Sequence, residues 1–233
     1  MKKFLWSLKH YLLYKLRSFL KYNKSEELEE KKRVIVSFTT LPSRFVNIKN
    51  TLSSLIYQTR IPDEIVIAIP RFSKREKVEY QIPDFINKIV KAANISGLFI
   101  KYPKISILHS DSDWGPATKF IPAIQREIQA DRHDYILIIV DDDQIYQRTM
   151  ISNFIKHHKT YKDFILCNRG RKLEKSMFYC NSEVILGTKI KDVTEVDIIT
   201  GVGGYLINPE LVDSSLWDYS DSPEGAFYMD DIW

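Results

Sequence analysis

The feature that most constrains the fold is the apolar run YILIIV at residues 135–140, which three aspartates, Asp141, Asp142 and Asp143, follow directly. Six consecutive apolar residues bounded by charges predict a short buried strand. In an open α/β sheet, ligands bind outside the carboxyl ends of the strands. The three carboxylates therefore stand where a ligand site is expected.

Other apolar runs alternate with segments of helical periodicity. Strands are predicted at residues 33–38, 64–69, 104–108 and 163–167. Helices are predicted at about 47–58, 75–94, 114–129 and 147–159. A less regular region follows residue 167. This alternation predicts an α/β fold with a mixed, mostly parallel open sheet flanked by helices.

Length and charge narrow the class of protein. A chain of 233 residues fits one catalytic-sized domain with an appendage. Residues 1–33 hold 10 Lys and Arg against 4 Asp and Glu, whereas the remainder holds 24 against 26. A nucleic-acid binder carries its basic stripe on the folded domain, so no nucleic-acid partner is predicted. Cys167 and Cys180 form no CxxC pair and are expected to be free thiols in a reducing compartment.

The basic leader predicts a separate element. Over residues 1–22, Leu and Phe recur at helical spacing while Lys and Arg interrupt every longer apolar run. This pattern predicts an amphipathic helix lying in the membrane interface, since a span needs about 20 mainly apolar residues. The alternative is a helix that packs on the body or on a second copy. Residues 23–32 are expected to form a charged connector to a folded domain at 33–233.

The aspartate triplet suggests a divalent metal. Adjacent carboxylates repel one another unless a cation or an array of donors neutralises them, and carboxylate oxygens suit Mg²⁺ or Mn²⁺. In a turn at a strand end, Asp141 and Asp143 can point to one side while Asp142 faces elsewhere. The alternative is a solvated turn followed by a helix N-cap. A second acidic pair, Asp111 and Asp113, precedes a predicted helix start, so N-capping by Asp113 is a further structural explanation.

Five segments in order carry a family resemblance. They are VSFTTLPSRFVNIKNTLSSLIYQTRIPDEIVIAI at 36–69, DWGPATKF at 113–120, VDDDQIY at 140–146, GVGGYLIN at 201–208 and MDDIW at 229–233. Together they resemble the nucleotide-sugar glycosyltransferases of the GT-A fold, especially an inverting, family-2-like group with bacterial and viral members. In that comparison VDDDQIY corresponds to the DxD motif and MDDIW to the ED motif.

The resemblance implies roles for individual residues. It assigns Asp143 and Asp141 to the metal, and Asp231, with Asp230 as the alternative, to the base that deprotonates the acceptor. The implied donor-binding residues are Thr39, Arg44, Asp113, Gly115, Lys119, Asp141 and Asp142. Gly203 and Gly204 are implied on the acceptor side. An exposed helix lysine at Lys119, and a turn or bulge at the two glycines, are the structural alternatives.

The chain also departs from the family pattern. The strand at 64–69 continues into Pro70 and Arg71, where the family often has an aspartate that recognises the nucleobase. Only two residues follow Asp231, which leaves open a minimal enzyme or a truncated product. Two other functions are weighed: a sugar-phosphate nucleotidyltransferase, which the glycine-free segment TTLPSR disfavours, and a catalytically inactive membrane-associated interaction module.

Taken together, the sequence predicts a metal-dependent glycosyltransferase. It would move a sugar from a nucleotide-sugar donor to a glycan or lipid-linked acceptor, with inversion, in surface polysaccharide or lipopolysaccharide assembly. The expected cofactor is Mn²⁺ or Mg²⁺. The expected location is the cytoplasmic, inner face of the plasma membrane, with residues 1–22 on the membrane surface.

Overall fold

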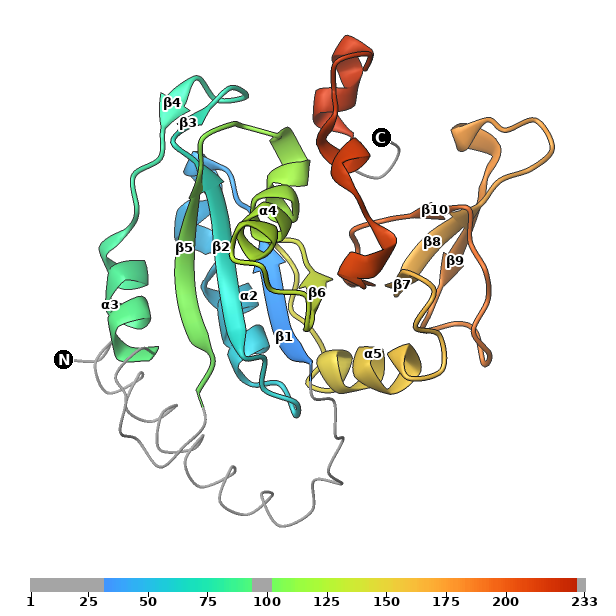
Figure 1. Cartoon of the computed structure of the whole chain (residues 1–233), viewed down its shortest axis with the longest axis horizontal. Coiled ribbons are helices and arrows are strands. Elements are labelled where there is room, and N and C mark those ends of the chain that lie inside the picture. Colours follow the sequence, from blue (N-terminus) through green and yellow to red (C-terminus); the bar gives the residue numbers. More distant parts are fainter. Residues whose placement is uncertain (1–31, 94–101, 230–233) are drawn as a thin grey trace.

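The computed structural model describes residues 32–93 and 102–229 and shows an α/β fold built on a six-stranded sheet (Figure 1). Across the sheet the order is β5-β2-β1-β6-β11-β7. The strands are β1 (Arg33–Phe38), β2 (Glu64–Pro70), β5 (Lys104–Ser110), β6 (Tyr135–Ile139), β7 (Leu166–Cys167) and β11 (Tyr205–Ile207). The predicted strand at 163–167 is thus reduced to two residues.

Strand pairing confirms the mostly parallel sheet. β1 pairs parallel with β2 on one side and with β6 on the other, so that Val36 lies opposite both Ile65 and Ile138. β2 pairs parallel with β5, whereas β11 runs antiparallel to both β6 and β7. The chain therefore moves outward from β1 to β5 and then returns to the other side of β1, as in a Rossmann-like arrangement.

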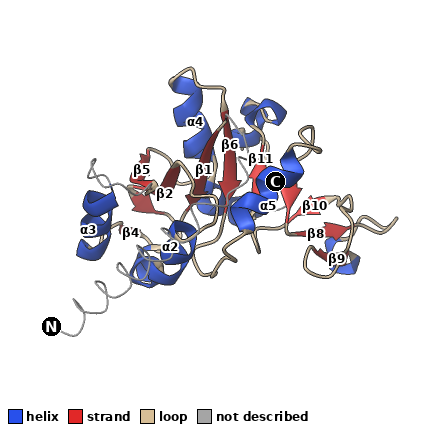
Figure 2. Ribbon diagram, turned by 90° about the horizontal axis from the view of Figure 1, so that it is seen from below, coloured by secondary structure: helices blue, strands red, loops and turns tan. Residues whose placement is uncertain are grey.

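Helices cover both faces of this sheet (Figure 2). One core cluster joins alternate strand residues such as Val34 and Val36 to apolar residues of α2 (Lys49–Ile56), α3 (Asp84–Ala93) and α5 (Met150–His158). The other joins residues of the opposite face to the short helix η3 (Gly115–Lys119) and to α4 (Ile121–Gln129). Because both faces are covered, the central strands consist mostly of consecutive apolar residues, which is why their runs stand out in the sequence.

Smaller elements depart from the sequence prediction. The predicted helix at 75–94 is wrong in its first part, where β3 (Phe72–Ser73) and β4 (Val78–Glu79) form a hairpin. The less regular region contains a three-stranded sheet of β10 (Ile198–Ile199), β8 (Arg169–Lys172) and β9 (Glu183–Leu186). Short helices complete the described chain: η2 (Pro42–Asn47), η4 (Tyr179–Asn181), η5 (Pro209–Leu211), η6 (Ser214–Trp217) and η7 (Glu224–Tyr228).

An ionic cluster lies at the amino ends of the strands, away from the aspartate triplet. Glu64 and Glu127 are fully buried there and are joined by Arg33 and Arg126, which contact both. Burial acts to raise the pKa of Glu64, but the Ser106 hydrogen bond and the Arg126 and Lys104 charges outweigh it and hold that pKa below its ordinary value.

The same cluster explains a second difference from the sequence. Helical periodicity predicts an apolar contact for Ile128, yet Ile128 is half exposed while its neighbour Glu127 is fully buried. The charged partners of Glu127 are Arg33 of β1, Arg126 of α4 and Arg132 just after α4, and they favour an orientation of α4 that turns Ile128 toward solvent.

Two sequence predictions concern other parts of the chain. The predicted leader helix at 1–22 and connector at 23–31 lie outside the described residues. Cys167 and Cys180 are both free thiols, as expected.

No helix in the described ranges has the length and apolar character needed to cross a membrane.

Candidate active-site pocket

A pocket lies at the carboxyl ends of the neighbouring strands β1 and β6. From β1 the strands β2 and β5 are added on one side of the sheet, and β6 is then added on the other side. Such a switch point is the usual ligand site of an open α/β sheet. All eight residues predicted to bind the donor or the metal line this one pocket: Thr39, Arg44, Asp113, Gly115, Lys119, Asp141, Asp142 and Asp143. They come from the loops after β1, β5 and β6, so the sheet itself brings them together.

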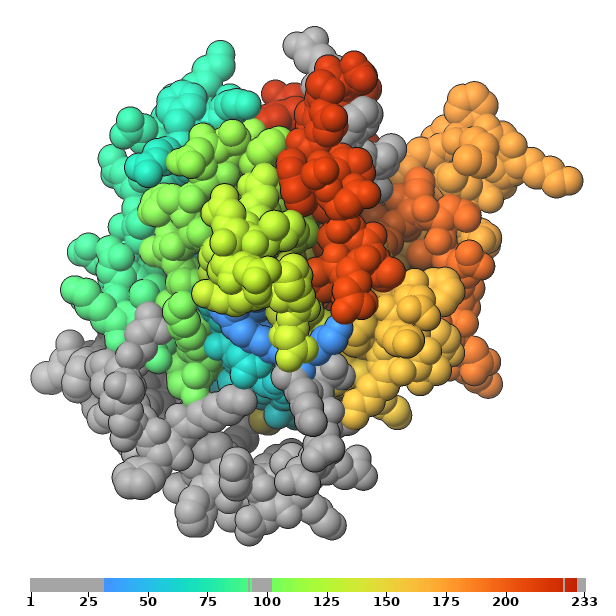
Figure 3. All heavy atoms as spheres, in the orientation of Figure 1, coloured from blue at the N-terminus to red at the C-terminus, as the bar shows by residue number. Residues whose placement is uncertain are grey.

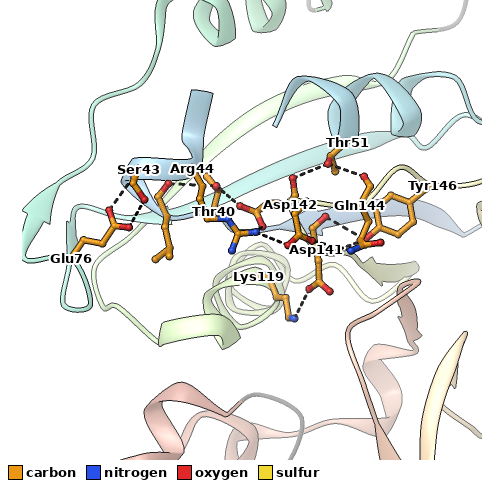
Figure 4. Close-up of polar contacts among 12 residues, drawn as sticks. Thr40, Ser43, Arg44, Thr51, Glu76, Lys119, Asp141, Asp142, Gln144 and Tyr146 are labelled. Atoms are coloured by element: carbon orange, nitrogen blue, oxygen red, sulfur yellow. Dashed lines mark hydrogen bonds and ion pairs between the residues drawn. The ribbon is translucent and has the colours of Figure 1, made fainter. Parts of the chain in front are cut away.

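Asp142 is the buried member of the triplet. Its side chain is 9% exposed and bonds to the Arg44 guanidinium, and it accepts a hydrogen bond of 2.5 Å from Thr40 Oγ1 (Figure 4). Burial raises the pKa of the Asp142 carboxyl and the Asp143 charge adds to this, whereas the Thr40 hydrogen bond and the Arg44 charge oppose it. Asp142 thus ties the loop after β1 to the loop after β6.

Asp141 is paired with a buried lysine. Lys119 Nζ lies 3.0 Å from Asp141 Oδ1, and the lysine side chain is only 7% exposed. The alternative of an exposed helix lysine is therefore wrong. The backbone of Asp141 is held by Tyr146, whose hydroxyl accepts from the Asp141 N–H at 2.7 Å. Burial raises the pKa of Tyr146, so this hydroxyl keeps its proton at neutral pH.

Asp143 is the accessible member, with 57% of its side chain exposed. Its carboxylate lies 2.9 Å from Arg44 Nη2, the same guanidinium nitrogen that contacts Asp142. One arginine therefore bridges two of the three aspartates, and Lys119 neutralises the third. This arrangement explains how three adjacent carboxylates are accommodated at one strand end.

The carboxylate oxygens in the pocket are ligands that magnesium and manganese ions prefer, and substrate phosphates often supply further ligands to such ions. Asp141 and Asp143 both line the pocket and offer carboxylate oxygens, and such ions commonly use one or two protein carboxylates. Within the described ranges, no group of three His, Cys, Asp or Glu side chains is placed to hold a metal ion. Phosphate oxygens and water would have to complete the coordination shell.

Asp113 and Gly115 shape the pocket wall. Asp113 Oδ1 accepts from the Gly115 N–H at 2.9 Å, and its Oδ2 accepts from the Lys74 N–H at 2.7 Å. Asp113 therefore bonds to the first residue of η3 and also anchors the β3–β4 hairpin. The N-cap position of η3 is Trp114, so the alternative of N-capping by Asp113 is wrong. Gly115 has a positive φ of 59°, and a Cβ there would come within 2.1 Å of the Phe227 carbonyl oxygen.

The contact at Gly115 brings the end of the described chain to the pocket, where Phe227 and Tyr228 of η7 form part of the lining. In the space-filling view, this C-terminal segment, in red, lies against the green region of η3 and α4 (Figure 3). Asp230 and Asp231, the predicted bases, lie outside the described residues.

Gly203 and Gly204 occupy the turn that leads into β11. Both have positive φ values, 84° and 85°, and a Cβ at Gly204 would approach the Ile139 carbonyl oxygen to 3.1 Å. A turn therefore accounts for both glycines, and neither belongs to the pocket lining. Their predicted contact with an acceptor stays a prediction.

Sequence reasoning missed several pocket residues. Ser73, Arg75 and Tyr80 line it from the β3–β4 hairpin and the residue after it, a segment whose charged composition had suggested a helix. Gly201 is not part of the lining but was also missed as a neighbour of two lining residues: a Cβ there would lie 2.9 Å from Asp141 Oδ1 and 3.0 Å from Lys119 Nζ. The glycine-rich segment at 201–204 was noticed in the sequence, but Gly203 and Gly204 were chosen from it. The glycine beside the Asp141 carboxylate is Gly201.

Comparison with known proteins does not identify a family for this chain. No protein-family model matches the chain, and no curated protein matches it significantly. Functional inference therefore rests on the residues and on their geometry.

Proposed function

We propose that this chain is a metal-dependent, nucleotide-sugar glycosyltransferase of the GT-A type. The observation that carries the proposal is the convergence of eight residues from three separate loops on one pocket at the switch point of the sheet. The sequence motifs alone predict these residues, whereas motifs unrelated to a common site would be scattered over the surface.

The charges of the pocket suit a nucleoside diphosphate. Asp143 and Asp141 would hold Mn²⁺ or Mg²⁺, which would neutralise the charge that develops on the leaving diphosphate. Lys119 and Arg44, already in the lining, supply two further cations for phosphate oxygens. Arg75 adds a third positive side chain from the β3–β4 hairpin.

The acceptor requires a base near the donor. Asp231, or alternatively Asp230, would accept the proton of the attacking hydroxyl. Tyr228 lines the pocket, and Asp230 and Asp231 follow it by two and three residues in the sequence. A single carboxylate base acting on the acceptor suits transfer with inversion.

The remaining parts of the proposal concern the setting. We infer a glycan or lipid-linked acceptor in surface polysaccharide or lipopolysaccharide assembly, because the amphipathic sequence at 1–22 would confine the enzyme to the inner, cytoplasmic face of the plasma membrane. A nucleotidyltransferase is less well supported, since the loop after β1, residues 39–44, contains no glycine to cradle a phosphate.

A thermal-shift panel tests the donor site. UDP, GDP, dTDP and CMP are each added with and without Mn²⁺ to the wild type, to Asp143→Asn and to Asp111→Asn. Asp111 is a matched control because its side chain is 99% exposed and it is absent from the pocket lining. At a hundredfold excess over Kd, a ligand that binds only the folded state adds about 2.7 kcal/mol, or roughly 5–11 °C in Tm.

The expected result is that one nucleotide stabilises the wild type and Asp111→Asn only when Mn²⁺ is present, and that Asp143→Asn loses this shift. Two outcomes contradict the proposal: no nucleotide shifts the wild type, or Asp143→Asn responds as the wild type does. Asp231→Asn and Asp230→Asn then test the base, since loss of sugar transfer with retained nucleotide binding is expected for the correct one.

A further inference from the structure

A second cavity lies beside the active-site pocket and shares Asp113 and Phe227 with it. We call it the aromatic hollow and define it by Trp114, Tyr219, Pro223 and Phe227. Its volume is about 230 Å³.

The aromatic rings of the hollow are held in place by the fold. The Trp114 and Tyr219 rings lie 5.8 Å apart at 47° to each other, and both pack partly against the core cluster beneath α4. Phe227 is positioned by the contact of its carbonyl with Gly115, and Lys74 Nζ lies 5.4 Å from the centre of its ring. Rings fixed in this way form a binding surface that needs little reordering when a ligand arrives.

The chemistry of the rim indicates an uncharged ligand with many hydroxyl groups. Ser112 and Ser222 contribute polar groups, and among the described residues that line the hollow the one cation, Lys74, is balanced by the one carboxylate, Asp113. An anion such as a phosphate would find no excess of positive charge here. The electron-rich faces of aromatic rings attract the positively polarised C–H groups of a pyranose, and hydroxyl and charged groups at the rim can bond to its hydroxyls.

We propose that the aromatic hollow binds one pyranose ring of the acceptor glycan. The assignment of that sugar to the acceptor rests on the proposed function, because it depends on the neighbouring pocket taking the nucleotide donor. Phe227 lines both the hollow and the donor pocket, and the next residue, Tyr228, lines the donor pocket. A glycan seated in the hollow would therefore lie beside the donor and near the chain that leads to the predicted base.

Saturation-transfer NMR on the full-length protein tests the hollow. The probes are the methyl pyranosides of glucose, galactose, mannose, rhamnose and N-acetylglucosamine, each without nucleotide or metal. At least one should receive saturation at its ring C–H protons. Tyr219→Leu, which keeps an apolar side chain but removes the ring, should weaken its affinity about three- to tenfold. Tyr219→Phe should retain most of it.

Controls separate this proposal from the donor site and from loss of folding. Tyr161→Leu makes the same change to a half-buried tyrosine after α5 that belongs to neither cavity, and it should bind as the wild type does. The Mn²⁺-dependent nucleotide shift should survive in Tyr219→Leu, which shows that the fold and the donor pocket are intact.

Three outcomes would overturn the hollow as a sugar site. In the first, the wild type transfers no saturation to any pyranoside. In the second, Tyr219→Leu binds the pyranoside as tightly as Tyr219→Phe does. In the third, Tyr219→Leu keeps pyranoside binding but loses the Mn²⁺-dependent nucleotide shift. The last would assign the hollow to the nucleobase of the donor. If no nucleotide binds the wild type but a pyranoside does, the donor proposal fails while the sugar site stands.

Discussion

Three adjacent aspartates meet three different surroundings at the end of β6. Asp141 pairs with a buried lysine, Asp142 is buried against Thr40 and Arg44, and Asp143 is largely exposed. The sequence predicted a divalent metal ion beside them, which stays a prediction, and the structure adds two protein cations, Arg44 and Lys119. The sequence could not assign the partners, because these depend on how the loops after β1 and β5 meet the loop after β6.

Single residues of the pocket were predictable where they directly follow a strand. Asp141 and Thr39 follow buried runs that are evident in the sequence, so their place at the sheet edge follows from the fold class. The pocket residue Tyr80 and the neighbouring Gly201 do not directly follow such a run. Tyr80 enters through a hairpin with two-residue strands, and the importance of Gly201 lies in the missing Cβ beside Asp141.

Gly115 gives a prediction at the scale of one residue. Gly115→Ala should destabilise the protein by about 1–3 kcal/mol and release the C-terminal segment, because the new Cβ meets the Phe227 carbonyl and the positive φ disfavours any side chain. Chemical denaturation measures the stability, and limited proteolysis measures access to residues 219–229.

Gly225→Ala is the matched control, since a Cβ there meets no atom within 4 Å. It should be near neutral in stability and in proteolysis. Equal protease resistance in Gly115→Ala and the wild type would contradict the packing of η7 on η3.

The strands and helices that the sequence predicted are those with a long apolar pattern. β1, β2 and β6 are recovered to within a few residues, because burial on both faces leaves a continuous run, and the edge strand β5 is recovered although most of its side chains are half-buried or exposed. The β3–β4 hairpin and the sheet of β8, β9 and β10 were missed, since strands of two to four residues are too short to carry a periodic signal. Helix α4 was predicted, but the charged contacts of Glu127 set its orientation.

The ionic cluster between α4 and the sheet gives a prediction at the scale of elements. Arg126→Leu should destabilise the protein by about 2–3 kcal/mol, because it removes a partner from two fully buried carboxylates at once. Urea denaturation at neutral pH measures the change in the free energy of unfolding.

Arg132→Leu provides the comparison. Arg132 contacts the same Glu127 at 3.1 Å, but its side chain is 54% exposed, so its loss should cost less than about 1 kcal/mol. If the two variants are equally stable, the cluster does not fix α4 on the sheet.

Over the whole molecule, burial is distributed unevenly. The central sheet and its helices hold both core clusters, whereas β8 and β9 contribute no side chain to either. Local opening requires little free energy where few apolar contacts are broken. The three-stranded sheet should therefore open independently of the rest.

Hydrogen exchange followed by mass spectrometry checks this prediction. Amides in residues 169–186 should exchange at least about a hundredfold faster than those of β1, β2 and β6 under native conditions. Uniform protection across these segments would mean that the described chain opens only as one unit.

The pocket wall extends from Thr39 after β1 to Tyr228 in η7, and this has a consequence for protein synthesis. A ribosome that has released β6 and its three aspartates has made the acidic centre of the pocket but neither η7 nor the ring of Phe227. A nascent chain at that stage, or a product of premature termination, would expose the carboxylates and Arg44 without the part of the pocket wall that packs against Gly115. Translation must therefore pass almost the whole described chain before a complete site can exist.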